Sequence, residues 1–127
     1  MRVLLVEDNP AMQQEMARTI GAIPGGRVVQ VADAADTAID WLDANPEGWD
    51  LAIVDLFLAT GHGFQVLRRC KRRGPHQRAV VVSNYTRPPV ADYARQAGAD
   101  RFFDKSLELD ALVQYCKGFG DTLARSG

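Results

Sequence analysis

Five short apolar runs recur along this chain, and each is followed by a longer segment whose apolar residues return every three or four positions. Short apolar runs that alternate with amphipathic segments predict parallel strands joined by helical crossovers. Such crossovers are right-handed and cover both faces of the sheet. The pattern therefore predicts a single α/β domain over residues 1–127, a flavodoxin-like (βα)5 doubly wound sheet with strand order 2-1-3-4-5.

The expected strands are residues 2–6, 27–31, 50–56, 78–82 and 101–104. The expected helices are a segment from Pro10 to Ile23, one opened by Asp33, one through Phe64 and Cys70, one from Pro88 to Gly98, and a last one through Leu123. Proline and glycine residues interrupt the chain between these segments, as they do at turns and helix ends.

Composition narrows the class of protein further. A chain of 127 residues with 46% hydrophobic and 24% charged residues is long enough to bury a core of its own. A net charge of -1 gives no general attraction to nucleic acid or to an anionic membrane, and no apolar run approaches the ~18 residues of a membrane span. The two cysteines, Cys70 and Cys116, are far apart, which favours a reducing compartment over a disulfide framework or a zinc site. We expect a cytoplasmic protein.

Polar side chains stand where the predicted strands end. Glu7 and Asp8 follow the first strand, Asp55 lies at the end of the third, Ser83 follows the fourth and Lys105 follows the fifth. The carboxyl ends of parallel strands share one edge, which is where open α/β sheets bind ligands. Three carboxylates placed together repel one another and resist joint ionisation without a cation. The pattern predicts a metal site and chemistry on a carboxylate oxygen.

Each of these residues also has an ordinary explanation. An aspartate such as Asp55 is common in turns, an acidic pair favours a helix N-terminus, and the Ser83 hydroxyl can bond to the local backbone. Lys105 can be a surface charge. The combination favours a functional site, because four separate strand ends each supply a group that the chemistry needs.

The chain resembles the receiver domains of bacterial two-component response regulators, the CheY-like superfamily, over essentially its whole length. The resemblance is carried by four motifs in the family's order: Val6-Glu-Asp-Asn-Pro10, Asp55-Leu-Phe-Leu-Ala-Thr-Gly-His-Gly63, Val82-Ser-Asn84 and Ala97-Gly-Ala-Asp-Arg-Phe-Phe-Asp-Lys105.

This resemblance implies that Asp55 is a phosphoacceptor, which takes a phosphoryl group from a sensor histidine kinase or a phosphotransfer protein. It implies Mg²⁺ as the cofactor, bound by Asp8 and Asp55, by Glu7 through a water, and by the backbone carbonyl of Phe57. The only catalysis implied is the protein's own phosphorylation and dephosphorylation.

The family's output is a conformational switch. By resemblance, Lys105 and the Ser83 hydroxyl contact the phosphoryl oxygens, and Phe102 turns inward when Ser83 moves. The signal then passes to a protein target at the face made by the fourth helix, the fifth strand and the fifth helix. Neither nucleic acid nor a membrane is an expected direct partner.

The chain departs from the family pattern at several positions. The usual lysine-proline pair is Lys105-Ser106 here, and we expect a trans bond because a cis bond to a non-proline residue costs about 2.5–4 kcal/mol. Ser106 is suited to cap the last helix. Ala59 replaces a usual loop proline. Phe57 and Tyr85 are bulky where the hydrolytic water would pass, so we hypothesise a long-lived aspartyl phosphate.

Other functions compete with this one. A pseudo-receiver scaffold would bind partners without phosphorylation, and a receiver cut from a transcriptional regulator would act through a fused domain. The short segment after Leu123 favours a stand-alone receiver. A phosphatase of the haloacid dehalogenase type would need a second aspartate where Phe57 stands. The basic run at 68–73 could bind nucleic acid, but cations at a helix C-terminus explain it better.

Overall fold

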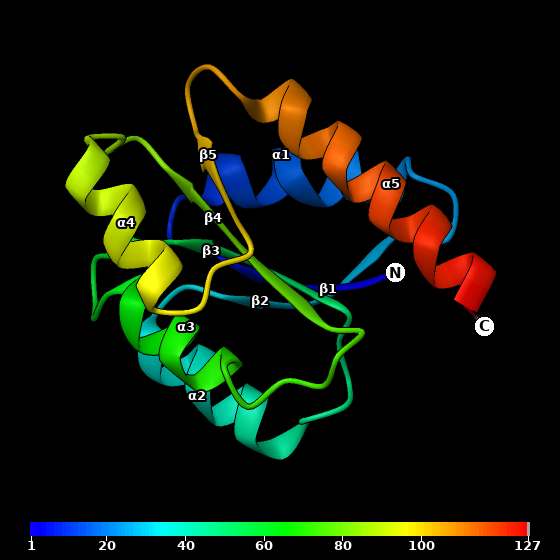
Figure 1. Ribbon diagram of the computed structural model, residues 1–127, viewed down its shortest axis with the longest axis horizontal. Helices are drawn as coiled ribbons and strands as arrows, with labels where there is room; N and C mark the ends of the chain where they lie inside the picture. The colour runs from blue at the N-terminus through cyan, green and yellow to red at the C-terminus, as the bar shows by residue number, and fades with distance from the viewer. Residues whose placement is uncertain (127) are drawn as a thin grey trace.

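A parallel sheet forms the centre of the molecule (Figure 1). The computed structural model describes residues 1–126, the last of these by its backbone alone, so Gly127 of the predicted domain lies outside the described residues. Within this range the sheet has five strands in the order β2-β1-β3-β4-β5, which confirms the predicted fold. The strands are β1 (Arg2–Val6), β2 (Arg27–Ala32), β3 (Leu51–Asp55), β4 (Arg78–Ser83) and β5 (Arg101–Asp104).

Helices cover both faces of this sheet. They are α1 (Pro10–Gly21), α2 (Ala35–Ala44), α3 (Gly63–Cys70), α4 (Pro88–Gln96) and α5 (Leu109–Ser126). Figure 1 shows α1 and α5 on one face and α2, α3 and α4 on the other. Within residues 1–126, no helix combines the length and the apolar character needed to cross a membrane.

The strands alternate their side chains between the two helical layers. On β1, Val3 and Leu5 belong to the core cluster beneath α1 and α5, whereas Leu4 and Val6 belong to the cluster beneath α2, α3 and α4. The strands β3 and β4 divide their residues in the same way. Because both faces are buried, these strands are apolar at nearly every position, as central strands of parallel sheets are.

Several helix ends differ from the predictions. The helix α4 ends at Gln96 and not at Gly98, and α5 continues past Leu123 to Ser126. The first helix ends at Gly21 and not at Ile23, and its cap is the Asn9 side chain, which accepts from the Met12 N–H at 3.0 Å. Asp33 does not open α2, since that helix begins at Ala35 after an Ala34 without a side-chain cap. Ser106 does not cap α5, which begins three residues later at Leu109.

The register of the strands aligns their carboxyl ends. Val6 lies beside Val54, Asp55 beside Val82 and Ser83 beside Asp104. The residues at and after these positions therefore meet at one edge of the sheet. The bond between Lys105 and Ser106, which leads out of β5, is trans as predicted.

At the opposite edge of the sheet, an ion pair joins the first residue of β1, Arg2, to Asp50, which precedes β3. The Asp50 carboxylate accepts from the Arg2 N–H at 2.7 Å and from the Arg2 guanidinium at 3.1 Å. Burial alone would raise the pKa of Asp50, but the hydrogen bonds from Arg2 prevail and hold it below its ordinary value.

We expect Asp50→Asn to lower the free energy of unfolding at pH 7 by about 1–2 kcal/mol, because the charged form of Asp50 is the one that the fold favours. A depressed carboxyl pKa contributes stability above the unfolded value of about 4, and that contribution is lost as the pH falls through the folded value. Urea unfolding of both proteins should therefore converge at acid pH. A difference that persists unchanged there, or a matching loss in the exposed control Asp121→Asn, would contradict this role.

Candidate functional site

Three acidic side chains meet at the carboxyl edge of the sheet. Glu7 directly follows β1 and is 3% exposed, Asp55 ends β3 and is 8% exposed, and Asp8 is half-buried. One carboxylate oxygen from each of them lies within 4.8 Å of the others. The structure thus brings together the three acids that the sequence places at two separate strand ends.

Backbone and side-chain donors hold two of these acids in place. The Asn9 N–H donates to Glu7 Oε2 at 3.1 Å, and the Phe57 N–H donates to Asp55 Oδ1 at 3.2 Å. The side chain of Gln13, from the first turn of α1, donates to the Glu7 carbonyl at 2.6 Å. Both acids keep a second carboxylate oxygen that these donors do not use.

The third acid is held by the loop after β3. The Ala59 N–H donates to Asp8 Oδ2 at 2.6 Å, joining residues far apart in the chain. A proline at position 59 has no N–H and could not make this bond. The departure from the family pattern at Ala59 therefore provides a donor that fixes Asp8.

Lys105 supplies the positive charge of the site. Its Nζ lies 2.5 Å from Glu7 Oε1 and 3.1 Å from Asp55 Oδ2. Burial alone would lower the pKa of Lys105, but its contacts with the two carboxylates raise that pKa overall, so the ammonium stays charged. Burial raises the pKa of Glu7, and the hydrogen bond from Lys105 offsets this only in part.

Ser83 is fully buried beside these groups. Its carbonyl accepts from the Lys105 N–H at 2.9 Å, and its Oγ accepts from the Tyr85 N–H at 3.0 Å. Within residues 1–126 the hydroxyl proton of Ser83 has no acceptor. A serine hydroxyl can donate and accept at once, so this proton is available to an oxygen placed over Asp55.

The arrangement suits a hard divalent cation. Carboxylate oxygens and water are the ligands that Mg²⁺ prefers, and it tolerates sites with few protein ligands. Such a cation would also relieve the repulsion among the three acids, two of which are buried. Within residues 1–126, Lys105 is the one cationic side chain that pairs with them.

Two residues named from the sequence lie outside the charged cluster. The Phe57 ring is 52% exposed and packs on the Tyr85 ring, with centroids 5.0 Å apart. Phe102 is half-buried on β5 and packs against the core beneath α2, α3 and α4. Its role as a switch residue stays a prediction.

Sequence patterns did not indicate several supporting contacts. Gln13 and the Ala59 amide reach the acids through the fold, and no motif points to them. Ser106 donates its hydroxyl to Asn84 Oδ1 at 3.0 Å and so joins the loops after β4 and β5. Asn84 lies in a motif, but its partner is set by the three-dimensional arrangement of the two loops.

Gly63 places α3 tightly against the end of β3. A Cβ at Gly63 would lie 2.8 Å from the Leu56 Cα and still closer to the Asp55 carbonyl oxygen, and both of these are backbone atoms. We expect Gly63→Ala to cost about 1–3 kcal/mol of unfolding free energy, since the end of β3 must shift. Urea unfolding measures this loss.

Gly118 offers the matched control, because a Cβ there meets nothing within 4 Å on α5. Gly118→Ala should instead stabilise the protein by about 0.5–1 kcal/mol through helix propensity. If both substitutions stabilise the fold, the close packing at Gly63 does not constrain the site.

Comparison with known proteins agrees with this geometry. The family model described as the response regulator receiver domain matches residues 3–117, and the chain belongs to this family of signalling domains. It is 31% identical over 111 residues to the two-component response regulator ORR41 of Oryza sativa subsp. japonica, covering 87% of each protein. It is also similar to a solved structure of a LuxR-family two-component response regulator from Aurantimonas, with a TM-score of 0.78 and 27% identity over 89% of this chain and 79% of that one.

Some relatives are considerably longer. The Fimbriae Z protein of Salmonella typhimurium is 29% identical over 115 residues, which are 91% of this chain and 54% of that protein. The chain therefore spans about half the length of that relative.

Proposed function

We propose that residues 1–127 form a single receiver domain that accepts a phosphoryl group on Asp55 and signals to a protein partner. The donor is a sensor histidine kinase or a phosphotransfer protein, and the setting is the cytoplasm. The observation that carries the proposal is the Asp55 carboxylate at a strand end, with two further acids within 4.8 Å and the Lys105 ammonium at 3.1 Å. Catalysis is limited to the domain's own phosphorylation and dephosphorylation.

In the transfer step a carboxylate oxygen of Asp55 attacks the phosphorus of the donor. A phosphorus–oxygen bond to Asp55 forms as the phosphorus–nitrogen bond of phosphohistidine breaks, and the histidine nitrogen leaves with the electron pair. The Phe57 N–H holds Asp55 Oδ1 and so fixes the carboxylate's orientation. The protein has little covalent chemistry to perform, so its catalysis depends mainly on positioning and charge.

Glu7, Asp8 and Asp55, with the Phe57 carbonyl, are the residues that would hold Mg²⁺. When bound, Mg²⁺ supplies charge neutralisation to the acid cluster and to the phosphoryl oxygens. Lys105 is already poised over Asp55 and pairs with another phosphoryl oxygen, which an ammonium does as a single strong donor.

The switch follows from the new charge at Asp55. The Ser83 hydroxyl, whose proton has no acceptor within residues 1–126, moves to a phosphoryl oxygen, and Phe102 follows it inward, which shifts the population between two packings. Figure 1 shows β5 between α4 and α5, so a change at β5 reaches the face made by these three elements. That face is the proposed site for the downstream protein, with no direct contact to nucleic acid or membrane.

Intact mass spectrometry tests the proposal. The protein is incubated with acetyl phosphate in Mg²⁺ and, in parallel, in excess EDTA. A gain of one phosphoryl group in Mg²⁺ alone is the expected result. No gain under either condition would favour the competing pseudo-receiver, which binds partners without phosphorylation.

The aromatic pair beside the site should slow hydrolysis of the aspartyl phosphate. The backbone N–H groups of Phe57 and Tyr85 bond to Asp55 and Ser83, and their rings pack together at this edge. We expect Phe57→Ala and Tyr85→Ala each to speed decay about fivefold, which corresponds to about 1 kcal/mol in activation free energy. Decay is timed after the phosphodonor is removed, with Val31→Ala as a control for loss of an exposed apolar side chain. Unchanged rates in both aromatic variants would refute the shielding role.

A further inference from the structure

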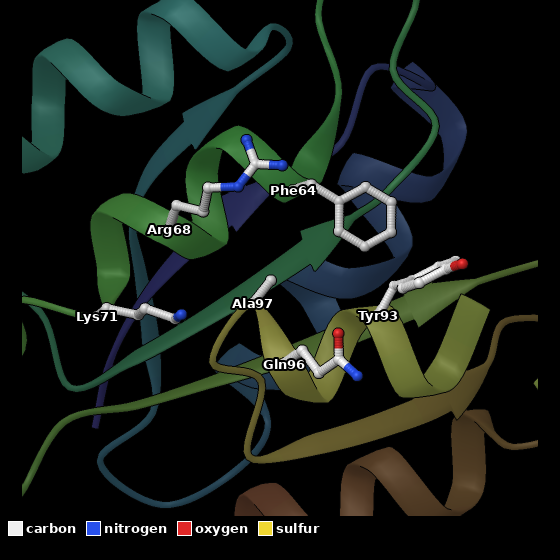
Figure 2. Close-up of a pocket in the computed structure, with 6 residues that line it drawn as sticks. All are labelled: Phe64, Arg68, Lys71, Tyr93, Gln96 and Ala97. Atoms are coloured by element: carbon white, nitrogen blue, oxygen red, sulfur yellow. The ribbon is translucent and has the colours of Figure 1, made fainter. Parts of the chain in front are cut away.

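A groove lies between α3 and α4, on the sheet face opposite α1 and α5 (Figure 2). It has a volume of about 400 Å³ and is lined by Phe64, Arg68, Lys71, Tyr93, Gln96 and Ala97. None of these residues belongs to the acid cluster or contacts Lys105. The groove is therefore separate from the acid cluster in both composition and location.

One end of the groove is apolar. Figure 2 shows the Phe64 and Tyr93 rings at the same end, one from each helix, with Ala97 between the helices. The Tyr93 side chain is 59% exposed, whereas Phe64 is half-buried against the core. Exposed aromatic rings beside a concave, small-residue floor are suited to an apolar anchor from a partner.

The other lining residues give the groove a positive charge. Arg68 lies on α3 and Lys71 directly follows this helix, and within residues 1–126 neither forms an ion pair. Among their neighbours, Arg69 pairs with Asp43 and Arg73 with Asp100, and Arg72 does not line the groove. No acid is among the lining residues, so the charge is left for a partner to neutralise.

The stem of Lys71 lies beside the backbone at Gly98. Gly98 follows α4 with a φ of +109°, and a Cβ there would lie 2.8 Å from Lys71 Cγ and 3.2 Å from Lys71 Cε. The lysine stem therefore rests against the backbone at Gly98. Ordering this long side chain costs less on binding when its stem is already packed.

We propose that this groove binds an acidic protein segment that carries one apolar anchor side chain. The anchor lies between Phe64 and Tyr93, and its flanking carboxylates pair with Arg68 and Lys71. A nucleic acid fits less well, because only these two cations of the groove are free and a nucleic-acid backbone is bound by a longer row of them. The proposal does not depend on phosphoryl transfer at Asp55.

Amide NMR of the isotope-labelled, unphosphorylated chain tests the proposal. The probe is a short peptide of glutamate and aspartate residues around one central tryptophan. We expect shifts to centre on Phe64, Lys71, Tyr93 and Gln96. The double variant Arg68→Glu, Lys71→Glu and the single variant Tyr93→Ala should each weaken binding at least about tenfold.

Two substitutions of the same kinds serve as controls outside the groove. Arg18→Glu reverses an exposed charge on α1 that pairs with Glu15, and Tyr85→Ala removes the ring of a residue that is 54% exposed, so both variants should bind the probe like the wild type. All the altered side chains are largely exposed, and circular dichroism confirms that each variant is folded.

Several results would overturn the proposal. Equal binding of a peptide without the tryptophan would show that no apolar anchor is recognised. Equal binding of a lysine-rich peptide would show that the positive charge of the groove is not recognised. Shifts caused by a single-stranded oligonucleotide but not by the peptide would assign the groove to nucleic acid. Self-association that the groove variants abolish would assign it to a second copy of the chain. Absence of any shift at about 1 mM peptide would also refute it.

Discussion

Asp55→Asn is expected to abolish phosphoryl uptake from acetyl phosphate and from any kinase donor. An amide has the shape of a carboxylate but is too weak a nucleophile to form the phosphorus–oxygen bond. The fold should survive, because Glu7 still pairs with Lys105 at 2.5 Å and the pair does not require Asp55. The amide can satisfy only one of its two donors, the Phe57 N–H or the Lys105 ammonium, with its oxygen.

The control for this substitution is Asp33→Asn. Asp33 also follows a strand, β2, at the same edge of the sheet, but it lies outside the three-acid cluster. Intact mass after incubation with Mg²⁺ and phosphodonor should show full uptake in the control and none in Asp55→Asn. Comparable uptake in both variants would place the acceptor elsewhere.

Lys105→Met is expected to have the largest effect on stability. The substitution keeps the apolar stem but removes the ammonium, which leaves Glu7 and Asp55 as buried acids without a counter-charge. Breaking a buried pair by removing one partner costs about 3–5 kcal/mol. We expect a loss of about 3 kcal/mol in urea unfolding in Mg²⁺-free buffer at pH 7.

Mg²⁺ should reverse much of this loss. The Lys105 ammonium rests on two of the three acids that would hold the metal, so its removal frees those oxygens. Lys105→Met should therefore bind Mg²⁺ more tightly than the wild type, and the metal should stabilise the variant more. The control Lys117→Met, on an exposed position of α5, should change neither quantity. A Lys105→Met protein as stable as the wild type without metal would show that the pair contributes no net stability.

The layout of the fold was predictable because the apolar pattern reports burial directly. The runs at 3–6, 51–54 and 79–82 are buried on both faces, and only the centre of a parallel sheet provides that. Helix ends were predicted less well, because a cap depends on local geometry. Asp33 is a good capping residue by type, yet α2 begins at Ala35 without a side-chain cap.

The residues of the candidate site were predictable, whereas the contacts that orient them were not. Glu7, Asp8, Asp55, Ser83 and Lys105 were identifiable because each stands at a strand end, and parallel strands bring these ends to one edge. The contacts that orient them were not identifiable. The Ala59 N–H bonds to Asp8, which lies 51 residues away in the sequence. A backbone donor of this kind cannot be recognised from the type of residue that carries it. Ser106 likewise bonds to Asn84 and not to α5, because the loops after β4 and β5 lie side by side.

We propose that the phosphoryl group resides on the Asp55 carboxylate. Its most direct test is reduction of the phosphorylated protein with borohydride, which converts an acyl phosphate to an alcohol, followed by peptide mass mapping. We expect homoserine at position 55, in the peptide that spans the end of β3, and in no other peptide. Homoserine at Asp8, the corresponding reduced product at Glu7, or phosphate retained on another side chain would contradict it.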